Sequence, residues 1–368
     1  MTQHPEKNAL RLNHELIDKT SIKGFISREQ DPLITEVLHF LNFWYNSDDF
    51  IKQQTSGSTG PPKMISVPKG MMMNSAAMTN RFFGLNEGHS ALLCLSPQYI
   101  AGKMMIIRAI LGGFKLITTN VSANPLATLN ESVSFTAMVP LQVAETLRQN
   151  PERLELVNTL IIGGSSLDQK TEHALQEVKT SCWHTYGMTE TLSHIALRKI
   201  NGSDKSKWYS PLKDISLRAD DRQCLVVDAP LLSSELVVTN DLVRFDLSGG
   251  FQIIGRADDV IFSAGHKIHP VLLEQKLEPL IPYPFMISSK PGFAGDEHVL
   301  VVQHELQISE LFVLWQQMTD VLPAHEVPRI IEYTDRLPML PSGKINRLAM
   351  KAILASSDEK TDESTDVE

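Results

Sequence analysis

The chain has 368 residues, of which 42% are hydrophobic and 21% are charged, and its formal net charge is −9. This composition is typical of a folded globular protein with room for about two domains. No stripe of Arg and Lys is interleaved with aromatic residues, so the sequence does not favour nucleic-acid binding. The polar N-terminus and the lack of a long uninterrupted apolar run predict a cytoplasmic protein without membrane insertion. Three widely spaced cysteines, Cys94, Cys182 and Cys224, predict reduced thiols rather than a zinc site or disulfides.

Short apolar runs alternate with helix-length segments between residues 50 and 230. This alternation predicts an α/β fold in which helices cover a mostly parallel sheet. Residues 1–49 hold one or two helices at most, including one at 33–44. Strands are expected at 91–95, 115–118, 134–138, 159–162 and 181–184, and helices at 69–83, 102–111, 141–149 and 168–179.

The pattern changes after Pro230. Alternating runs at 236–239, 243–246 and 251–254 predict antiparallel strands, the last two joined by the Ser248-Gly249-Gly250 turn. A small α+β unit is expected beyond them, with helices at 270–277, 308–318 and after Arg347, and strands at 285–288, 298–303 and 329–333. The predicted domains are therefore 1–257, including a shortened N-terminal part at 1–49, and 258–355. An acidic tail at 356–368 is expected to be disordered.

The segment from Gln54 to Lys63 concentrates glycines and hydroxyl side chains. Glycine lets the backbone approach an anion closely, hydroxyls donate hydrogen bonds and a lysine adds charge, so this loop suggests a phosphate site. It follows a strand end at Phe50-Ile51, and we expect it to leave the edge of a sheet, where α/β proteins usually bind nucleotides. Two prolines delay the lysine relative to the Walker A pattern, and a Ser/Gly-rich surface loop is the simpler alternative. The candidate phosphate-binding residues are Thr55, Ser56, Gly57, Ser58, Thr59, Gly60 and Lys63.

Two further segments follow predicted strands. Gly163-Gly164-Ser165 is either a tight turn or a flat backbone platform for a purine ring or an acyl group. The segment from Tyr186 and Gly187 to Glu190 offers an aromatic face for a base, the Thr189 hydroxyl for a phosphate and a carboxylate for Mg²⁺.

Three charged residues near the domain boundary and the C-terminus admit two interpretations each. Asp241 and Arg256 form either a surface salt bridge or a pair that binds the hydroxyls of a ribose. Lys344, in the segment from Pro341 to Arg347, is either a solvated lysine or part of a functional loop.

The order of these segments resembles the adenylate-forming enzymes, which include acyl-CoA synthetases, luciferases and adenylation domains. The shared motifs are Thr-Ser-Gly-Ser-Thr-Gly-x-Pro-Lys, Gly-Gly, Tyr-Gly-Met-Thr-Glu, Gly-Arg-x-Asp-Asp-x-Ile and Pro-Ser-Gly-Lys. The resemblance spans residues 50 to 353. The short chain and the segment from Tyr99 to Gly102, followed by an arginine, are most similar to the o-succinylbenzoate–CoA ligase group of menaquinone synthesis.

The resemblance implies an AMP-forming ligase that uses ATP, Mg²⁺ and coenzyme A with a small-molecule carboxylic acid, as a monomer or homodimer. Its fold would be a large N-terminal domain and a small mobile α+β domain that turns about Asp258. It places the β- and γ-phosphates on the Thr55 to Lys63 loop, the α-phosphate at Thr189 and Mg²⁺ at Glu190. Adenine would lie near Gly163, Gly164, Ser165, His184, Tyr186 and Gly187. Asp241 and Arg256 match the ribose pair, and Lys344 matches the lysine that bridges carboxylate and α-phosphate during adenylation.

The acyl substrate is expected at the helix that begins near Gly102. Arg108 interrupts its apolar run, and a buried cation needs an anionic partner. That partner is either a protein carboxylate or a second carboxylate on the substrate, as o-succinylbenzoate would carry. Other expected pocket residues are Tyr99, Ala101, Gly102, Leu192 and Ser193.

The chain also departs from the family pattern. Only about fifty residues precede the phosphate loop, Tyr99 replaces a common histidine, and His184 replaces an Asn or Gln. Two other functions stay open, an adenylating enzyme that loads a carrier protein and a nucleotide-binding protein that has lost catalysis.

Overall fold

A computed structural model of the chain describes residues 9–54, 64–292, 295–339 and 345–362, with side chains as far as residue 356. The chain forms two compact units. The first comprises Met1–Arg218, Val226–Val237 and Phe245–Gln252, and the second comprises Ala219–Leu225, Val238–Arg244 and Ile253–Glu368. The expected division into 1–257 and 258–355 stays a prediction.

The first unit is built on a nine-stranded sheet with the order β11-β10-β9-β8-β7-β5-β6-β1-β2. The strands from β9 to β1 in this order are parallel, whereas β2, β10 and β11 pair antiparallel with their neighbours. The predicted mostly parallel sheet is therefore confirmed. The strands are β1 (Leu10–Leu12), β2 (Glu15–Ile17), β5 (Ser90–Leu93), β6 (Lys115–Thr118), β7 (Val133–Met138), β8 (Val157–Ile162), β9 (Ser181–Gly187), β10 (His194–Lys199) and β11 (Ser210–Pro211).

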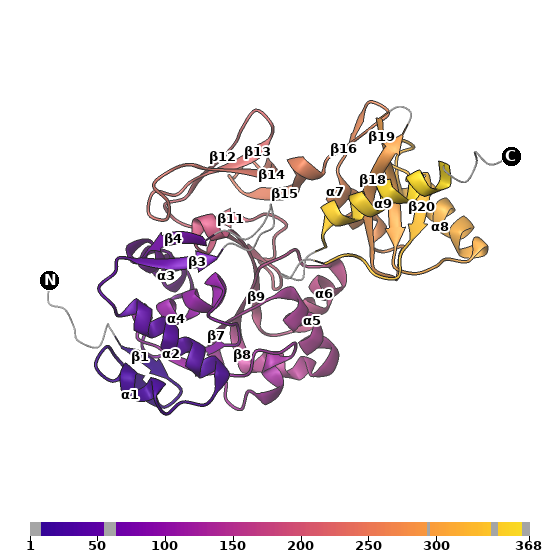
Figure 1. The fold of residues 1–368 in the computed structure, drawn as a ribbon. Coiled ribbons are helices and arrows are strands. Elements are labelled where there is room, and N and C mark those ends of the chain that lie inside the picture. Colours follow the sequence, from indigo (N-terminus) through magenta and orange to yellow (C-terminus); the bar gives the residue numbers. More distant parts are fainter. Residues whose placement is uncertain (1–8, 55–63, 293–294, 340–344, 363–368) are drawn as a thin grey trace. The chain divides into compact units, whose positions relative to one another are not determined.

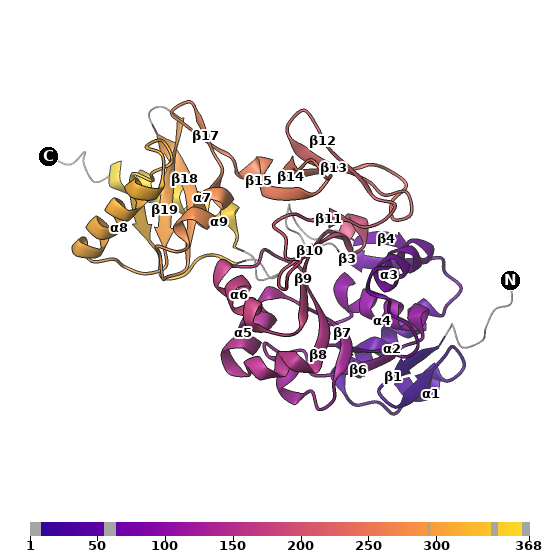
Figure 2. The same cartoon turned by 180° about the vertical axis from the view of Figure 1, so that it is seen from behind.

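Helices cover both faces of this sheet (Figures 1 and 2). One group contains α2 (Pro32–Trp44), α3 (Lys69–Phe83) and α4 (Ile100–Gly112), and the other contains α5 (Pro140–Gln149) and α6 (Gln169–Ala174). The short α1 (Ile22–Ile26) precedes them. Asp168 caps α6, and its side chain accepts a hydrogen bond of 2.7 Å from the Thr171 amide.

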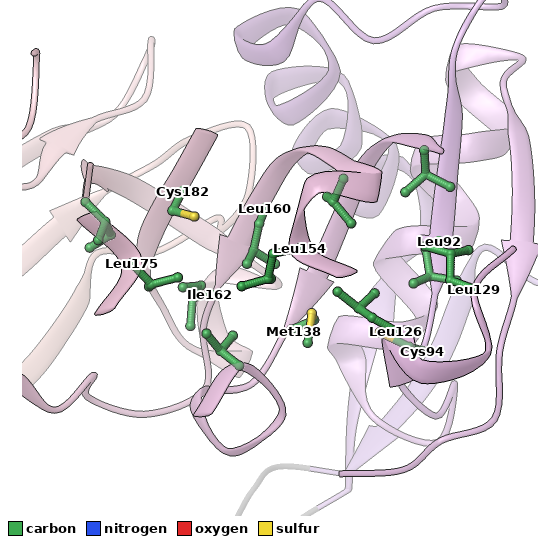
Figure 3. Packing of buried hydrophobic residues seen from close by; sticks show 14 of the residues in the cluster. Leu92, Cys94, Leu126, Leu129, Met138, Leu154, Leu160, Ile162, Leu175 and Cys182 are labelled. Atoms are coloured by element: carbon green, nitrogen blue, oxygen red, sulfur yellow. The ribbon is translucent and has the colours of Figure 1, made fainter. Parts of the chain in front are cut away.

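An apolar cluster fills the space between the sheet and the α5 side (Figure 3). Leu160 and Ile162 of the sheet pack in it with side chains from three short 3-10 segments, η2 (Pro125–Thr128), η3 (Pro151–Leu156) and η4 (Leu175–Glu177). The helix expected at 168–179 is shorter than predicted, because α6 gives way to η4 where Leu175 enters this core. Packing of β8 from this side fixes where its carboxyl end lies.

The expected phosphate loop does not leave the large sheet. Residues 55–63 connect β3 (Phe50–Gln54) and β4 (Met64–Pro68), which form a separate two-stranded antiparallel sheet. The segment thus follows a strand, as predicted, but this strand belongs to a small separate sheet, because β3 pairs with the strand that follows it in the chain.

A four-stranded sheet of order β12-β13-β14-β15 follows, and its strands contribute residues to both units. The strands expected at 236–239 and 243–246 are one continuous strand, β14. The polar residues in its middle are hydrogen-bonded: the Thr239 hydroxyl donates to the Leu225 carbonyl at 2.8 Å. The strands are β12 (Ser216–Ala219), β13 (Cys224–Asp228), β14 (Val237–Phe245) and β15 (Phe251–Arg256).

The second unit contains the predicted small α+β arrangement. Its five-stranded sheet has the order β17-β16-β19-β18, with β20 also paired to β19. The strands are β16 (Ile261–Ser263), β17 (His266–Ile268), β18 (Phe285–Gly292), β19 (Gly295–Val302) and β20 (Ile330–Tyr333), and the helices are α7 (Pro270–Leu277), α8 (Ile308–Val321) and α9 (Arg347–Asp362).

The last helix also corrects the expected tail. α9 continues to Asp362, so the part of the tail at 356–362 is helical rather than disordered, and 363–368 lie outside the described residues. The helix formers lie in its first part, 347–355, which is rich in Ala, Leu, Met and Lys, and 356–362 continue that helix. Over the described ranges, no helix combines the length and apolar character needed to cross a bilayer.

Candidate functional site

Three parallel strands end side by side where the sequence places several candidate residues. Met138 pairs with Ile162, which pairs with His184, so the segments after β7 and β8 leave the same edge of the sheet as the end of β9. The Gly163 amide donates to the Met138 carbonyl at 3.1 Å. A Cβ on Gly163 would lie 2.3 Å from the Thr185 hydroxyl oxygen, so a side chain at this position would require Thr185 to move.

His184 supports this backbone from the strand next to it. Its Nε2 lies 3.0 Å from the Ser165 carbonyl oxygen, which can only accept, so Nε2 carries the proton. Nδ1 is then an acceptor for the hydroxyl of Tyr209. Burial of the ring, reinforced by the Arg198 charge, lowers the pKa of His184 to about 4. The imidazole is therefore neutral, and each of its nitrogens has a protein partner.

Arg198 packs against the Tyr209 ring and is itself held by an ion pair. The guanidinium carbon of Arg198 lies 5.7 Å from the centre of the Tyr209 ring. Arg198 also donates two hydrogen bonds of 2.8 Å to the Glu172 carboxylate. This bidentate pair links α6 to β10 and holds Arg198 and Tyr209 in place beside His184.

Tyr186 belongs to an aromatic cluster rather than standing alone. Its ring lies edge-on to Phe251 at 5.4 Å between ring centres, and Phe251 stacks on Tyr209 at 5.4 Å. Backbone hydrogen bonds between Tyr209 and Phe251 fix this arrangement. The predicted base-covering tyrosine thus lies beside His184 and Tyr209.

Thr189 and Glu190 lie in the 3-10 turn η5 (Thr189–Thr191), directly after β9. Neither side chain has a hydrogen-bond partner among the residues that the structure describes, and the Glu190 carboxylate is exposed. No group of three or more His, Cys, Asp or Glu side chains in those same ranges could hold a metal. A cation at Glu190 would therefore need further oxygen ligands from a bound phosphate or from residues outside the described part.

A strained turn follows them. Leu192 has φ 67° and ψ −38°, and the Ser193 amide donates to the Thr191 carbonyl at 2.8 Å across it. A leucine rarely adopts a positive φ, and such strain persists only where surrounding contacts impose it. Here the buried Thr191 hydroxyl contacts the Met188 and Ser193 carbonyls. The turn places Leu192 in the core and Ser193 in the partly buried region next to α4.

The predicted acyl helix begins at the same edge of the sheet. A Cβ on Gly102 would lie 2.4 Å from the Ser96 carbonyl oxygen, so glycine allows α4 to start against the loop that leaves β5. Ala101 and Tyr99 are exposed at this helix start, and Tyr99 is its N-cap.

Arg108 lies on α4 and is 2% exposed. One Nη donates to the Ser193 hydroxyl at 2.6 Å, while Nε has no hydrogen-bond partner. Burial lowers the pKa of Arg108 to about 9, so it is still charged at neutral pH. No carboxylate of the described residues lies within ion-pair distance of it, so the expected alternative of a protein salt bridge is wrong for this part of the chain.

Sequence reasoning missed a second cation on the same helix. The Lys103 Nζ donates to the buried Gln53 side chain at 2.6 Å, and burial lowers the pKa of this lysine. Gln53 lies on β3, two positions before Thr55. A lysine in an otherwise apolar helix was the signal that could have found it.

Sequence reasoning also missed Tyr209 as the partner of His184. No local motif could have indicated it, because the β9, β10 and β11 pairings bring the two residues together.

The predicted ribose pair lies within the second unit. An Arg256 Nη donates to an Asp241 carboxylate oxygen at 3.1 Å, and the other Nη donates to Asp258 at 2.9 Å. The Asn240 amide also donates to both Asp258 oxygens, at 3.1 and 3.0 Å. The structure thus joins both ribose candidates to the predicted hinge residue, which lies in η6 (Ala257–Asp259).

Two sets of predicted residues lie outside the described part of the chain. These are the phosphate loop, Thr55, Ser56, Gly57, Ser58, Thr59, Gly60 and Lys63, and the lysine Lys344. The residues that flank Lys344 are described: Met339 bridges Ile345, and the Asn346 amide donates to the Pro338 carbonyl at 2.8 Å. Arg347 then donates hydrogen bonds of 2.9 and 2.6 Å to Glu274 of α7.

Comparisons with known proteins agree with this arrangement. Residues 47–229 match the family described as AMP-binding enzyme. A 2-succinylbenzoate–CoA ligase of Lactococcus lactis is 23% identical over 366 residues, covering 89% of this chain and 79% of that protein. The crystal structure of an acyl-CoA synthetase (AMP-forming)/AMP-acid ligase II-like protein from Dyadobacter fermentans is 31% identical, with a TM-score of 0.61 and coverage of 90% and 97%.

A more distant structure shares the fold. The O-succinylbenzoate coenzyme A synthetase of Bacillus subtilis, solved with ATP and magnesium, is 22% identical with a TM-score of 0.71, covering 81% of this chain and 68% of that one. The present chain belongs to the family of AMP-binding enzymes. This confirms the predicted resemblance to adenylate-forming enzymes and their α/β fold.

The neutral His184 predicts an acid sensitivity of folding. Its pKa is lowered from 6.5 to about 4, so between these values the unfolded chain binds a proton that the folded chain excludes. Stability should therefore fall as the pH falls from 6.5 to 4, by about 3 kcal/mol from this residue alone. His184→Gln keeps a donor for the Ser165 carbonyl but does not titrate, and its unfolding free energy in urea should vary less over this range.

The exposed His173→Gln serves as the matched control for the chemical change. An identical pH profile for the wild type and His184→Gln would contradict the assignment of His184 as a buried neutral imidazole.

Proposed function

We propose that this enzyme is an ATP-dependent acid–CoA ligase that forms an acyl adenylate and then a thioester, and that its acid is o-succinylbenzoate. Membership of the AMP-binding enzyme family supports the reaction class. The observation that supports a dicarboxylic acid is the buried, charged Arg108 without a carboxylate partner in the described residues.

In the first half-reaction, a carboxylate oxygen of the acid attacks the α-phosphorus of ATP. The bond from that phosphorus to the bridging oxygen breaks, and pyrophosphate leaves. Two anions must approach each other, so positive charge and hydrogen-bond donors are needed around the α-phosphate. We assign this role to Thr189 and Lys344, with the loop from Thr55 to Lys63 holding the pyrophosphate end.

The nucleoside is assigned to the two groups of residues described above. Adenine would lie on the Gly163-Gly164-Ser165 backbone beside Tyr186 and Gly187, with His184 supporting that backbone from below. The ribose hydroxyls would meet Asp241 and Arg256, one an acceptor and the other a donor, which is the complementarity that vicinal hydroxyls require. Asp258 is the proposed hinge.

Glu190 fits Mg²⁺ as the single protein carboxylate. It is exposed and has no partner in the described chain, and Mg²⁺ commonly binds one or two carboxylates together with substrate phosphates and water. When bound, the ion would neutralise negative charge on the phosphate oxygens.

In the second half-reaction, the sulfur of coenzyme A attacks the carbonyl carbon of the adenylate, and AMP leaves. The hairpin of β16 and β17 is the proposed CoA-facing element. Ala264 and Gly265 at its tip both have positive φ, 47° and 81°, as a tight two-residue turn requires. This turn sets His266 directly opposite Ser263.

The acid pocket is proposed at the start of α4, with Tyr99, Ala101, Gly102, Leu192 and Ser193 as its walls. The aromatic carboxylate of the substrate would react at the phosphate, and its succinyl carboxylate would pair with Arg108. An unpaired buried cation is costly, and a ligand carboxylate removes that cost when it binds. Recognition of the second carboxylate therefore contributes both affinity and selectivity.

A panel of acids tests the reaction class and the substrate together. With ATP, Mg²⁺ and CoA, o-succinylbenzoate should give AMP, pyrophosphate and a CoA thioester, while benzoate should give far less. An adenylate without a CoA thioester would point to a carrier-protein acceptor, and no AMP release with any acid would point to a nucleotide-binding protein without catalysis.

Arg108→Met should lower kcat/KM for o-succinylbenzoate by about 30-fold or more, the equivalent of about 2 kcal/mol. Turnover of an aromatic acid without the second carboxylate should change much less. Methionine fills a similar apolar volume, so removal of a buried charge should not unfold the protein. Arg153→Met, which removes a hydrogen bond to the Leu129 carbonyl, is the matched control. An equal loss for both acids would refute the assigned role.

Lys344→Ala should abolish adenylate formation, measured as pyrophosphate exchange, because the bridging charge is lost. The same variant should still make the thioester from supplied acyl adenylate, since that step needs no charge at the carboxylate. Lys351→Ala, at an ion-paired lysine on α9, is a control for removing a cation from the same unit. Equal losses in the two half-reactions would contradict the role of Lys344.

A further inference from the structure

A chain of buried hydrogen bonds extends from Arg108 to α3. After the Arg108 Nη donates to Ser193, the Ser193 hydroxyl lies 3.4 Å from Nδ1 of His194. The His194 Nε2 lies 3.2 Å from the Thr79 hydroxyl, which lies 3.2 Å from the Ser75 carbonyl. Arg108, His194 and Thr79 are 2%, 6% and 0% exposed.

The two ends of this chain determine its direction. The guanidinium can only donate, and the Ser75 carbonyl can only accept. Each hydroxyl between them can therefore accept from one neighbour and donate to the next, and His194 must accept at Nδ1 and donate from Nε2. A neutral imidazole meets this requirement, and burial together with the Arg108 charge keeps the pKa of His194 well below 6.5.

Unpartnered polar atoms gather on the same packed helices. Ser75 Oγ, Asn80 Oδ1 and Arg108 Nε are buried and have no hydrogen-bond partner. Asn80 lies next to the backbone of α4, because its amide donates to the Arg108 carbonyl at 2.9 Å. Buried polar groups are rarely left without partners, so such a cluster points to a ligand or ordered water.

We propose that Thr79 and His194 are positioning residues for the acid site, which orient Ser193 and thereby hold the Arg108 guanidinium so that its unpartnered Nε, and the Nη whose other contact is the weakly accepting Met105 sulfur, can donate to the distal carboxylate of the substrate. This inference rests on the proposed function. It adds that a residue on α3, remote from the recognised motifs, contributes to the choice of acid.

The geometry gives a reason for such a relay. A flexible guanidinium in an apolar pocket would lose rotamer freedom when the substrate binds, whereas one already held by a hydroxyl loses less. A carboxylate at the same point would hold Arg108 equally well, but it would neutralise the charge that the substrate needs. A hydroxyl backed by a neutral histidine positions the cation without neutralising it.

Thr79→Val tests the relay, because it keeps the side-chain shape and removes only the hydroxyl. We expect KM for o-succinylbenzoate to rise about fivefold, as the loss of one hydrogen bond predicts, with little change in kcat or in KM for ATP. Thr79→Ser, which restores the hydroxyl, should return KM toward the wild-type value. Thr146→Val is the matched control, since Thr146 is also 0% exposed and donates to the carbonyl one turn earlier, that of Gln142, at 2.8 Å.

A double-mutant cycle shows whether Thr79 acts through Arg108. In the Arg108→Met background, Thr79→Val should have no further effect on KM for the acid. A full additional effect there, an unchanged KM in the single variant, or the same change in Thr146→Val would overturn the relay. A wild-type enzyme that forms no adenylate from o-succinylbenzoate would instead overturn the proposed function, and this inference with it.

Discussion

A positive charge buried without a counter-ion among the described residues is the constraint on which the proposed acid site depends. The guanidinium of Arg108 has lost most of its contact with water, and within the described chain it receives no carboxylate. Such a group is tolerated only when neighbouring groups accept its hydrogen bonds. A hydroxyl and a methionine sulfur accept them here. Neither of these groups is charged, so the proposed acid site would favour an anionic substrate group.

The parallel sheet brings other residues of the proposed site to the edge where α4 begins. Because helices cover both faces of the sheet, the positions at which β7, β8 and β9 end are fixed. The turns that follow these strands are fixed with them. The backbone after β8 is supported by His184, and the turn after β9 carries both the Thr189-Glu190 pair and the Ser193 contact to α4. Residues of three chain segments therefore share one edge without any of them needing to be adjacent in sequence.

Sequence patterns predicted elements well where burial alone determines them. The continuous apolar runs of β7 and β8 are examples, since both strands are largely buried in the sheet. The same reasoning divided β14 in two, because Thr239-Asn240-Asp241 reads as a turn when its partners are unknown. Those partners are Leu225 and Asp258, which pairing and chain reversal supply. The relations of His184 to Tyr209 and of Lys103 to Gln53 are likewise tertiary, and neither has a local signature. Membership of the family could be predicted from ordered motifs, whereas the partners of Arg108 could not.

The full occupation of His184 has a consequence for how this protein distinguishes one nucleotide from another. The imidazole of His184 donates its N–H to the Ser165 carbonyl and accepts from the Tyr209 hydroxyl. Neither nitrogen is therefore available for a hydrogen bond to the edge of a base. Discrimination between adenine and guanine would then fall to amide and carbonyl groups of the 163–165 backbone, whose position the histidine holds. His184, which replaces an amide side chain of the family, would then support the backbone that contacts the base. Base preference would depend on the geometry of that backbone.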